Sequence, residues 1–421
     1  MQEIAMRPSI VAAPDRAAEG RQRIDWVRRH MPILSQLETV FRKEQPLQGL
    51  RVVVSVHLEA KTAYLALVLR SAGAQVAVTG SNPESTKDEV VAALAAAGLH
   101  VYARQGASPD EMRGMMGMAL DVQPNIIIDD GGDIVELLHE DRAELLPHVL
   151  GACEETTSGV MRAKARCLAK QLAFPVLLIN DARCKYLFDN VHGTGQSVWD
   201  GVMRSTNLVV AGKTVVVAGY GWCGKGVGLR AQGLGAQVIA CEVDPVNAAD
   251  ALMNGCRVMP LAEACREADI IITATGVRHT LRADHFAVLK NNSLLANAGH
   301  FWDEIDVASL QAAAAERCRL REQVEGYRMP DGRWLYLLGK GNLVNIACAD
   351  GHPAEIMDTS FALQALAAKY LAVHGHSMTS AASKVPEELD QHVARLKLSG
   401  VGVSIDTLTP EQRTYRSSWQ A

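Results

Sequence analysis

The sequence predicts an α/β protein with two tandem parallel-sheet domains, separated by a cleft and followed by a C-terminal helical return. Two observations support this prediction. Short runs rich in valine and isoleucine alternate with helix-length segments twice along the 421 residues, which is typical of parallel sheets covered by helices. A turn of the pattern G-x-G-x-x-G stands between two such runs at the start of the second series, which is typical of a Rossmann-like domain.

The first series follows a helical pattern at 24–41, which Pro32 breaks or kinks. A helix that closes at Gly73 follows the first strand. Thr86 and Glu89 have the spacing of a capping box and predict the start of the next helix. The strands expected in this series are RVVVSVHL (51–58), QVAVTG (75–80), HVYAR (100–104), NIIIDD (125–130) and FPVLLIND (174–181).

The second series opens with the strand 215–217 and the glycine-rich turn. Gly219 suits the tight turn, Gly221 lets the backbone approach a pyrophosphate, and Gly224 lets the following helix pack close to the sheet. Glu242 ends the next strand, where a carboxylate accepts from both ribose hydroxyls and repels a 2′-phosphate. Three glycines alone would only indicate a turn. Between two strands and before an acid, they favour binding of NAD over NADP.

The later strands and the helical return define the expected domains. Residues 1–190 form a substrate-binding and catalytic domain, and residues 191–351 form an NAD-binding Rossmann domain. Residues 352–400 are expected to dock back on the first domain, which gives a cleft with two hinge crossings, and 401–421 form a tail. The boundary falls near 185–210, where strand signals are few. The later strands are CRVMP (256–260), DIIITATG (269–276), SLLANAGH (293–300) and RWLYLLG (333–339).

Composition excludes several classes of partner. With a net charge of −5 the chain offers no basic surface, so we expect no nucleic-acid and no membrane partner. The absence of a long apolar run and of a signal peptide predicts a cytoplasmic protein. Nine cysteines with no C-x-x-C pair and no zinc-ligand spacing predict reduced thiols and no metal site.

Polar residues stand at the carboxyl ends of the expected strands, where an open α/β sheet forms its ligand crevice. They are His57, Asp129, Asp130, Asp181 and His300, with Lys185, Asp189 and Asn190 shortly after the strand 174–181. A single histidine or aspartate is more often a helix cap or a hydrogen-bonded core residue, but several at equivalent strand ends favour a site. The segment EETTSG (154–159) fits either a helix N-cap or a ribose diol.

A set of motifs in order along the chain identifies a family. The motifs are HLEAKTAYLA, DDGGD, EETTSG, KYLFDN, GYGWCGKG, NAGHF and DGHP. Together they resemble S-adenosyl-L-homocysteine hydrolase, in the shorter form typical of archaea and some bacteria, over about residues 22–419. The resemblance implies a tightly bound NAD, a nucleoside thioether as the small-molecule substrate, and a homo-oligomer, either a tetramer or a dimer.

The implied reaction is reversible hydrolysis of S-adenosyl-L-homocysteine to adenosine and L-homocysteine. NAD oxidises the ribose 3′-hydroxyl, the C4′ hydrogen becomes acidic, homocysteine leaves from C5′, water adds, and the ketone is reduced again. The resemblance assigns Lys185 and Asp189 to the 3′-hydroxyl, where a lysine with a lowered pKa would take the proton. It assigns Glu155 to the diol, Asp130 and His57 to C4′ and C5′, and His300 to the ribose.

The remaining implied roles concern binding. Glu59 and Lys61 read the base, and His352 belongs to the loop that closes over it. The residues that match cofactor positions are Thr156, Thr157, Ser158, Asn190, Gly219, Gly221, Gly224, Glu242, Asn247, Thr275, Gly299 and Asn345, with His300 also among them.

The chain departs from the common form of the family in four places. Its Leu58, Glu59, Ala60 and Lys61 replace Met-Thr-Val-Glu, and because lysine donates while glutamate accepts, the pair fits either adenine or hypoxanthine. The segment 339–342, which includes Lys340 and Asn342, replaces Ala-Glu-Gly-Arg, and Ser158 replaces a threonine. The C-terminus has no Lys-Tyr-bearing tail of the kind that reaches a neighbour's NAD in longer members.

Three other functions therefore stay open at this point. The first is hydrolysis of S-inosyl-L-homocysteine. The second, suggested by the altered segment 339–342, is a paralogue that oxidises a nucleoside at C3′ and epimerises it. The third is a regulatory protein that senses NAD; the presence of the whole set of ionisable residues argues against it.

Overall fold

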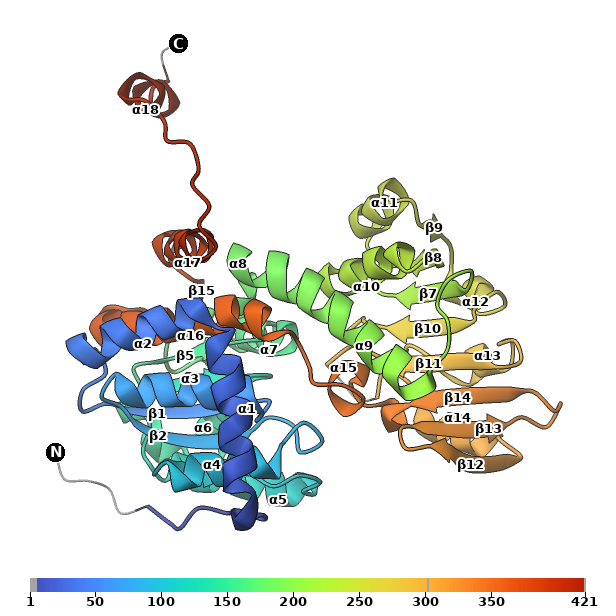
Figure 1. The fold of residues 1–421 in the computed structure, drawn as a ribbon, viewed down its shortest axis with the longest axis horizontal. Helices are drawn as coiled ribbons and strands as arrows, with labels where there is room; N and C mark the ends of the chain where they lie inside the picture. Colours follow the sequence, from blue (N-terminus) through green and yellow to red (C-terminus); the bar gives the residue numbers. More distant parts are fainter. Residues whose placement is uncertain (1–5, 301–302, 420–421) are drawn as a thin grey trace.

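The computed structural model describes residues 6–300 and 303–419, which form two β-sheets joined by long helical segments (Figure 1). The α/β class and the Rossmann-like parallel sheets predicted from the sequence are confirmed. None of the helices in the described ranges is long and apolar enough to cross a bilayer.

The first sheet has the strand order β15-β6-β5-β4-β1-β2-β3, and all its neighbouring strands are parallel. Six of these strands come from the first half of the chain, whereas β15 comes from close to its C-terminal end. The sequence pattern gave no sign of β15. The strands are β1 (Arg51–Val56), β2 (Gln75–Gly80), β3 (His100–Tyr102), β4 (Ile126–Asp129), β5 (Gly151–Glu154), β6 (Val176–Leu178) and β15 (Ala382–Lys384).

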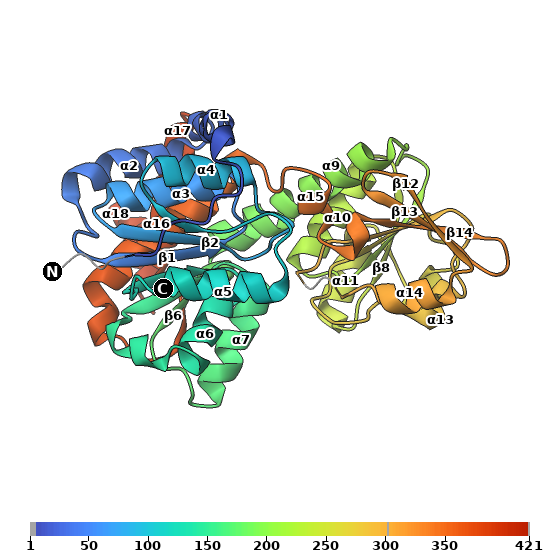
Figure 2. The same cartoon turned by 90° about the horizontal axis from the view of Figure 1, so that it is seen from below.

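Helices cover both faces of this sheet (Figure 2). Because side chains alternate along a strand, Val52 and Val54 of β1 belong to the core on one face and Val53 to the core on the other. The first face is covered by α1 (Ala17–Arg29), α2 (Pro32–Glu44), α3 (Ala60–Ser71), α4 (Asp88–Ala96) and α16 (Ala354–His374). The second is covered by α5 (Pro109–Leu120), α6 (Asp133–Glu140) and α7 (Thr157–Leu168).

Helices α2 and α4 differ in how their first turns are held. Pro32 breaks the helical pattern into α1 and α2, and the buried Asp358 of α16 caps α2 by accepting from the amides of Ile33 and Leu34 at 2.9 and 2.8 Å. The predicted capping box of α4 is wrong, because no side chain caps this helix. Glu89 instead pairs with Arg16, directly before α1, and with Arg23 of α1.

The second sheet has the order β12-β13-β14-β11-β10-β7-β8-β9. The strands from β14 to β9 are parallel, whereas β12 and β13 add an antiparallel edge that the sequence analysis missed. The strands are β7 (Thr214–Ala218), β8 (Gln237–Cys241), β9 (Arg257–Val258), β10 (Ile270–Thr273), β11 (Ser293–Asn297), β12 (Glu316–Arg321), β13 (Val324–Arg328) and β14 (Trp334–Leu338). The helices are α10 (Trp222–Gly233), α11 (Pro245–Met253), α12 (Leu261–Ala264), α13 (Ala283–Phe286) and α14 (Val307–Ala313).

Two segments connect the sheets. The first crossing is helical throughout and consists of α8 (Arg183–Lys185), a π-helix (Tyr186–Gly193) and α9 (Thr194–Thr206). The second crossing runs from a 3-10 turn (Gly339–Gly341) through α15 (Val344–Ala347) to α16. After α17 (Glu387–Gly400) the chain extends away from the rest of the molecule and ends in α18 (Pro410–Ser417), which buries none of its residues (Figure 1).

Candidate active site

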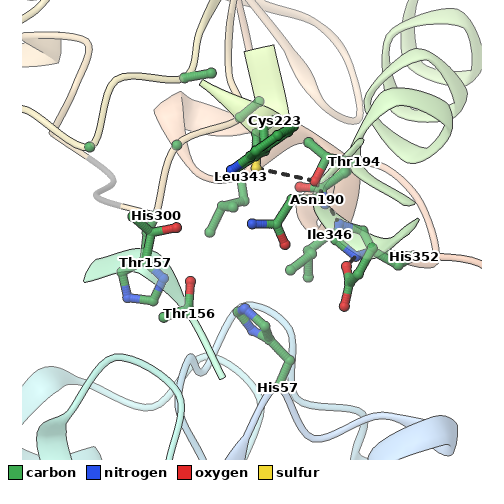
Figure 3. A pocket seen from close by; sticks show the side chains of 18 of the residues that line it. His57, Thr156, Thr157, Asn190, Thr194, Cys223, His300, Leu343, Ile346 and His352 are labelled. Carbon is green, nitrogen blue, oxygen red and sulfur yellow. Dashed lines mark hydrogen bonds and ion pairs between the residues drawn. The ribbon is translucent and has the colours of Figure 1, made fainter. Parts of the chain in front are cut away.

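A cleft of about 1800 Å³ lies between the two sheets and is lined from both sides. Numbered along the chain within each parallel set, the first sheet has the order 3-2-1-4-5-6-7 and the second has 3-2-1-4-5-6, so in both the strand order reverses direction between the first and fourth strands. These strands are β1 and β4 in one sheet and β7 and β10 in the other. The candidate side chains come from the loops after these and neighbouring strands, and Figure 3 shows several of them facing a common space.

His57 and Asp130 follow β1 and β4, with His57 Nε2 at 3.6 Å from Asp130 Oδ2. His57 Nδ1 is hydrogen-bonded to Ser85 Oγ at 2.8 Å. The Ser85 hydroxyl donates its only hydrogen to the carbonyl of Asn82, so it must accept from the imidazole. Nδ1 therefore carries the proton, and the unprotonated Nε2 faces Asp130. Burial lowers the pKa of His57 and favours this neutral form, although the Asp130 carboxylate opposes the shift.

Lys185 lies in the middle of a buried polar cluster. Its ammonium donates to Asn190 Oδ1 at 2.8 Å and lies 3.4 Å from Asp189 Oδ2 and 3.7 Å from Glu155 Oε1. An α-helical turn aligns residues four positions apart, whereas a π-helical turn aligns residues five apart. The π-helix after Lys185 therefore lets both Asp189 and Asn190 reach the same ammonium group.

The predicted lowering of the pKa of Lys185 is wrong. Burial acts to lower the pKa, but Asp189 and Glu155 together outweigh it, and the net shift is upward. Lys185 is therefore a cation in the free site. The same attraction, with hydrogen bonds from His352 and Ser360, holds the pKa of Asp189 low in spite of its burial.

Glu155 is the carboxylate of this cluster that titrates near neutrality. Burial raises its pKa to about 7, and Lys185 limits the rise. One of its oxygens accepts from Gln364 of α16, and the other has no hydrogen-bond partner within the described residues. A buried carboxylate oxygen without a partner is costly, so a ligand hydroxyl is the natural partner for it.

Two further buried carboxylates hold the loops that carry these groups. Asp129 and Glu154 are paired in register on β4 and β5. Asp129 accepts from the amides of Asp130 and Val135, and its carbonyl accepts from the amide of Glu155. Glu154 Oε1 accepts from the amides of Gly131 and Thr156 at 2.9 and 3.0 Å. Burial raises the pKa of both, that of Asp129 to about 7.

Asn180 is a site residue that the sequence analysis missed. Its side chain donates to Thr157 Oγ1 at 3.2 Å and accepts from Asn190 Nδ2 at 3.0 Å. It thus connects the threonine of the EETTSG segment to the amide that holds Lys185. The neighbouring Asp181, which the strand-end rule selected, instead pairs with Lys164 on the surface. The rule was wrong by one residue because the strand ends at Leu178 and a 3-10 turn follows.

The glycine-rich turn has the geometry that a dinucleotide needs. Gly219 has a φ of +91°, and a Cβ at that position would lie 2.6 Å from the carbonyl oxygen of Ala274. A Cβ on Gly224 would lie 1.9 Å from the carbonyl oxygen of Gly219. Gly221 is the N-cap of α10, and nothing lies within 4 Å of its Cβ position, so a pyrophosphate has room to approach the first amides of the helix.

The rest of the cofactor set fits NAD as well. Glu242 directly follows β8 and accepts from the amides of Tyr220, Val243 and Asp244, which fixes its carboxylate at the cleft. Ser158 Oγ and Asn345 Oδ1 are buried without a hydrogen-bond partner among the described residues, as expected for groups that meet a ligand. Thr156, Thr157, Asn190, Asn247, Thr275 and Gly299 line the same cleft.

Glu304, another residue that the sequence analysis missed, holds the Thr275 loop. Its buried carboxylate accepts from the amides of Thr275 and Gly276 and from the Thr275 hydroxyl, and burial raises its pKa. His300, from the same side of the cleft, lies against Gly131, where a Cβ would be 3.0 Å from its Nε2. The two walls of the cleft therefore approach each other beside Asp130.

The expected base-reading pair lies between the first sheet and the second crossing. Lys61 Nζ donates to Glu59 Oε2 at 2.8 Å and to the carbonyl of Asp350 at 3.1 Å. His352 reaches the first crossing, where its Nδ1 is hydrogen-bonded to Asp189 and its Nε2 lies 3.2 Å from Thr194 Oγ1. The structure thus brings together all the residues that the sequence analysis selected for catalysis and substrate binding.

Comparison with known proteins gives a consistent result. Residues 190–351 match the family model described as S-adenosyl-L-homocysteine hydrolase, NAD binding domain, and residues 9–145 match the model described as S-adenosyl-L-homocysteine hydrolase. The chain is 52% identical over 404 residues to an adenosylhomocysteinase of Pyrococcus abyssi, with 96% of each chain covered. It is 50% identical over 408 residues to an S-inosyl-L-homocysteine hydrolase of Methanopyrus kandleri, with 97% of this chain and 96% of the relative covered. An adenosylhomocysteinase of Thermotoga maritima is 50% identical over 401 residues, with 95% of this chain and 99% of the relative covered.

Proposed function

Because the chain belongs to the S-adenosyl-L-homocysteine hydrolase family and carries its NAD-binding domain, we propose that it reversibly hydrolyses S-adenosyl-L-homocysteine to adenosine and L-homocysteine. The observation that supports this most directly is the buried cluster of Lys185, Asp189, Asn190 and Glu155 at the floor of the cleft. Such a cluster suits a ribose with two free hydroxyls, since it combines a cation with carboxylate acceptors. Bound NAD supplies reversible oxidation at the ribose 3′-carbon.

Lys185 and Glu155 have different roles at the 3′-hydroxyl: one stabilises charge and the other accepts the proton. Because the pKa of Lys185 is raised, its ammonium donates to the 3′-oxygen and stabilises negative charge there. Glu155, with a pKa of about 7, is suited to accept the hydroxyl proton near neutral pH. Asp189 stays ionised and keeps Lys185 charged and in place.

His57 and Asp130 act next to C4′ and C5′. The neutral His57 presents its free Nε2 to the cleft, so it takes a proton from the water that adds at C5′. In the earlier elimination, the proton that Asp130 takes from C4′ passes to Nε2 of His57, 3.6 Å away, and from there to the departing thiolate. Asp130, held by the Ser81 hydroxyl at 3.1 Å, is the acceptor next to it for the C4′ proton.

The base is read by Glu59 and Lys61. Two hydrogens of the Lys61 ammonium are bound by Glu59 and by the Asp350 carbonyl, which leaves one for the base. Adenine offers N1 to this donor and its N6 hydrogens to Glu59, whereas hypoxanthine offers O6 and its N1 hydrogen. S-inosyl-L-homocysteine is therefore the second candidate substrate, supported also by the Methanopyrus relative.

The test is homocysteine release from purified protein supplied with the adenosyl or the inosyl thioether in parallel. We expect higher kcat/KM for the adenosyl compound; a preference for the inosyl compound would replace the first candidate with the second. If neither releases homocysteine while a nucleoside is oxidised and an epimer appears by NMR, the function is nucleoside epimerisation. If NAD binds but no nucleoside reacts, the regulatory function is the correct one.

We also propose that the chain acts as a cytoplasmic homo-oligomer, a dimer or a tetramer. Exposed apolar side chains, among them Val243, Val246 and Met253, support a partner surface on the NAD-binding side. All nine cysteines are free thiols, which fits a reducing compartment. Light scattering of the purified protein measures the assembly, and a monomer at micromolar concentration would contradict it.

The domain division is a further proposal. We assign residues 1–190 and 352–400 to the unit that contains the first sheet, and residues 191–351 to the unit that contains the second. The two units are expected to close on substrate by moving about the two crossings. Small-angle scattering with and without a 3′-deoxy nucleoside tests this closure. An unchanged radius of gyration would contradict it.

A further inference from the structure

Lys87 lines the cleft, and its ammonium has no partner of opposite charge among the described residues. Five lysine and arginine side chains line the cleft. Within the described part of the chain, four of them are ion-paired: Lys61, Lys185, Arg23 and Arg282. The Lys87 ammonium has no hydrogen bond or ion pair with any described residue, and the side chain is partly exposed to the cleft.

The loop after β2 places Lys87 at one end of the proposed reaction site. Ser81 of this loop donates to Asp130, and Ser85 is hydrogen-bonded to His57. The amide of Lys87 donates to the carbonyl of Leu58 at 3.0 Å, directly after His57. The lysine therefore stands next to the pair proposed to act at C4′ and C5′, on the same loop that holds both of them.

Of the groups of the proposed substrate, only the homocysteine tail still has no binding residue assigned to it. The base meets Glu59 and Lys61, and the ribose hydroxyls meet Lys185 and its carboxylates. The homocysteine tail leaves C5′ through its sulfur, beside His57, and its α-carboxylate is the only anionic group of the substrate. Lysine is a flexible point charge that suits a carboxylate at a partly solvated position.

Building on the proposed function, we propose that Lys87 binds the α-carboxylate of the homocysteine tail and thereby selects an amino-acid thiol as leaving group. The tail occupies the rim of the cleft between the loop after β2 and α1, whose residues Gln22 and Trp26 line the same rim. Thiols without a carboxylate then lose this contact and bind weakly.

The experiment measures thioether synthesis, in which adenosine and the thiol are varied separately. Lys87→Met is expected to raise KM for homocysteine about tenfold, the effect of one charge-assisted contact at a partly exposed site. KM for adenosine stays unchanged, and Lys87→Arg retains most of the affinity for homocysteine. Lys43→Met, on the exposed surface of α2, controls for the change in net charge.

A second thiol, 3-aminopropane-1-thiol, lacks only the carboxylate. Wild type and Lys87→Met are expected to use it with equal KM. The proposal is overturned if the variant leaves KM for homocysteine unchanged, if it raises KM for adenosine equally, or if it weakens the carboxylate-free thiol by the same factor. Failure of the wild-type protein to form any thioether would instead refute the proposed function.

Discussion

Six parallel strands in each sheet share the order 3-2-1-4-5-6, but the two sheets differ in what their crevices offer a ligand. In the first sheet, the loops at the switch point carry the ionisable side chains of His57 and Asp130, and the next loop, after β5, carries Glu155. In the second, the equivalent loop carries Gly219 and Gly221 and offers backbone amides. Topology therefore determines where a ligand binds, and the residues of the loops determine whether the crevice carries out chemistry or holds an anion.

Lys185→Met should sharpen this contrast with the largest effect. Removing the cation that faces the 3′-oxygen is expected to lower kcat by about a thousandfold, while the content of bound NAD stays near that of the wild type. Turnover and NAD content are measured on the same preparation. Lys164→Met removes a surface ion pair with Asp181 and serves as control. Unchanged turnover of Lys185→Met would remove this residue from the catalytic set.

Gly224→Ala disturbs the second crevice, where it should weaken cofactor binding and leave the first crevice intact. Its Cβ would lie 1.9 Å from a backbone oxygen, so the turn must shift, and we expect NAD affinity to fall by about a hundredfold. Binding of adenosine to the first crevice, measured by calorimetry, should change little. Gly233→Ala lies in the same helix, with nothing within 4 Å of its Cβ, and should behave as wild type. Equal loss of both ligands would show that the crevices are not independent.

Asp129→Asn tests how ionisation of the first crevice affects stability. Burial raises the pKa of Asp129 to about 7, above its value in the unfolded chain. Its contribution to stability is therefore fully present below about pH 4 and is lost as pH rises through about 7. The asparagine variant should show a smaller fall of the thermal midpoint between pH 5 and pH 8, by a few degrees (~2–4 °C per kcal/mol).

The control for this prediction is Asp141→Asn, which removes a surface ion pair with Arg113. Its profile between pH 5 and pH 8 should parallel that of the wild type. If Asp129→Asn also parallels the wild type, Asp129 is not protonated in the folded protein.

Trp222→Phe concerns a contact that links the two regions and should have the smallest effect. Trp222, at the start of α10, stacks on Tyr186 of the π-helix with ring centroids 4.5 Å apart. We expect NAD affinity to fall by only about threefold, but a fluorescence change on NAD binding should disappear. Trp26→Phe, on α1, should retain it. Persistence of the signal in Trp222→Phe would place its source elsewhere.

Much of the fold follows from local sequence patterns. The valine-rich and isoleucine-rich strands, the alternation and the glycine-rich turn are local, and each was predicted correctly. The strand-end rule selected His57 and Asp130, because parallel strands bring their carboxyl ends to one edge. β15 was missed because its partner β6 is distant in sequence. The β12–β13 hairpin is local, but it was missed because β12 (ERCRLR) is charged and mostly exposed and so lacks the apolar pattern of the other strands.

The site depends even more on long-range contacts. The pKa of Lys185 follows from two carboxylates, one of which comes from a different loop, whereas the sequence analysis took the lowered pKa from the role that the resemblance implies. The π-helix aligns Asp189 and Asn190 on one ammonium, and the sequence analysis did not detect it. Asn180 directly precedes Asp181 after the strand, and a shift of one residue decides which of the two contacts the buried polar cluster and which pairs with Lys164 on the surface.

The origin of β15 and α16 has a consequence for how the protein is made. Both complete the first sheet and its core, yet they leave the ribosome after the whole second sheet. The second sheet is continuous in sequence and can finish folding during synthesis, because domains generally fold as units. Until residues 354–384 emerge, the first sheet lacks β15 beside β6 and lacks α16 on one of its faces. The NAD-binding half of the cleft is therefore complete before the half that carries His57 and Asp130.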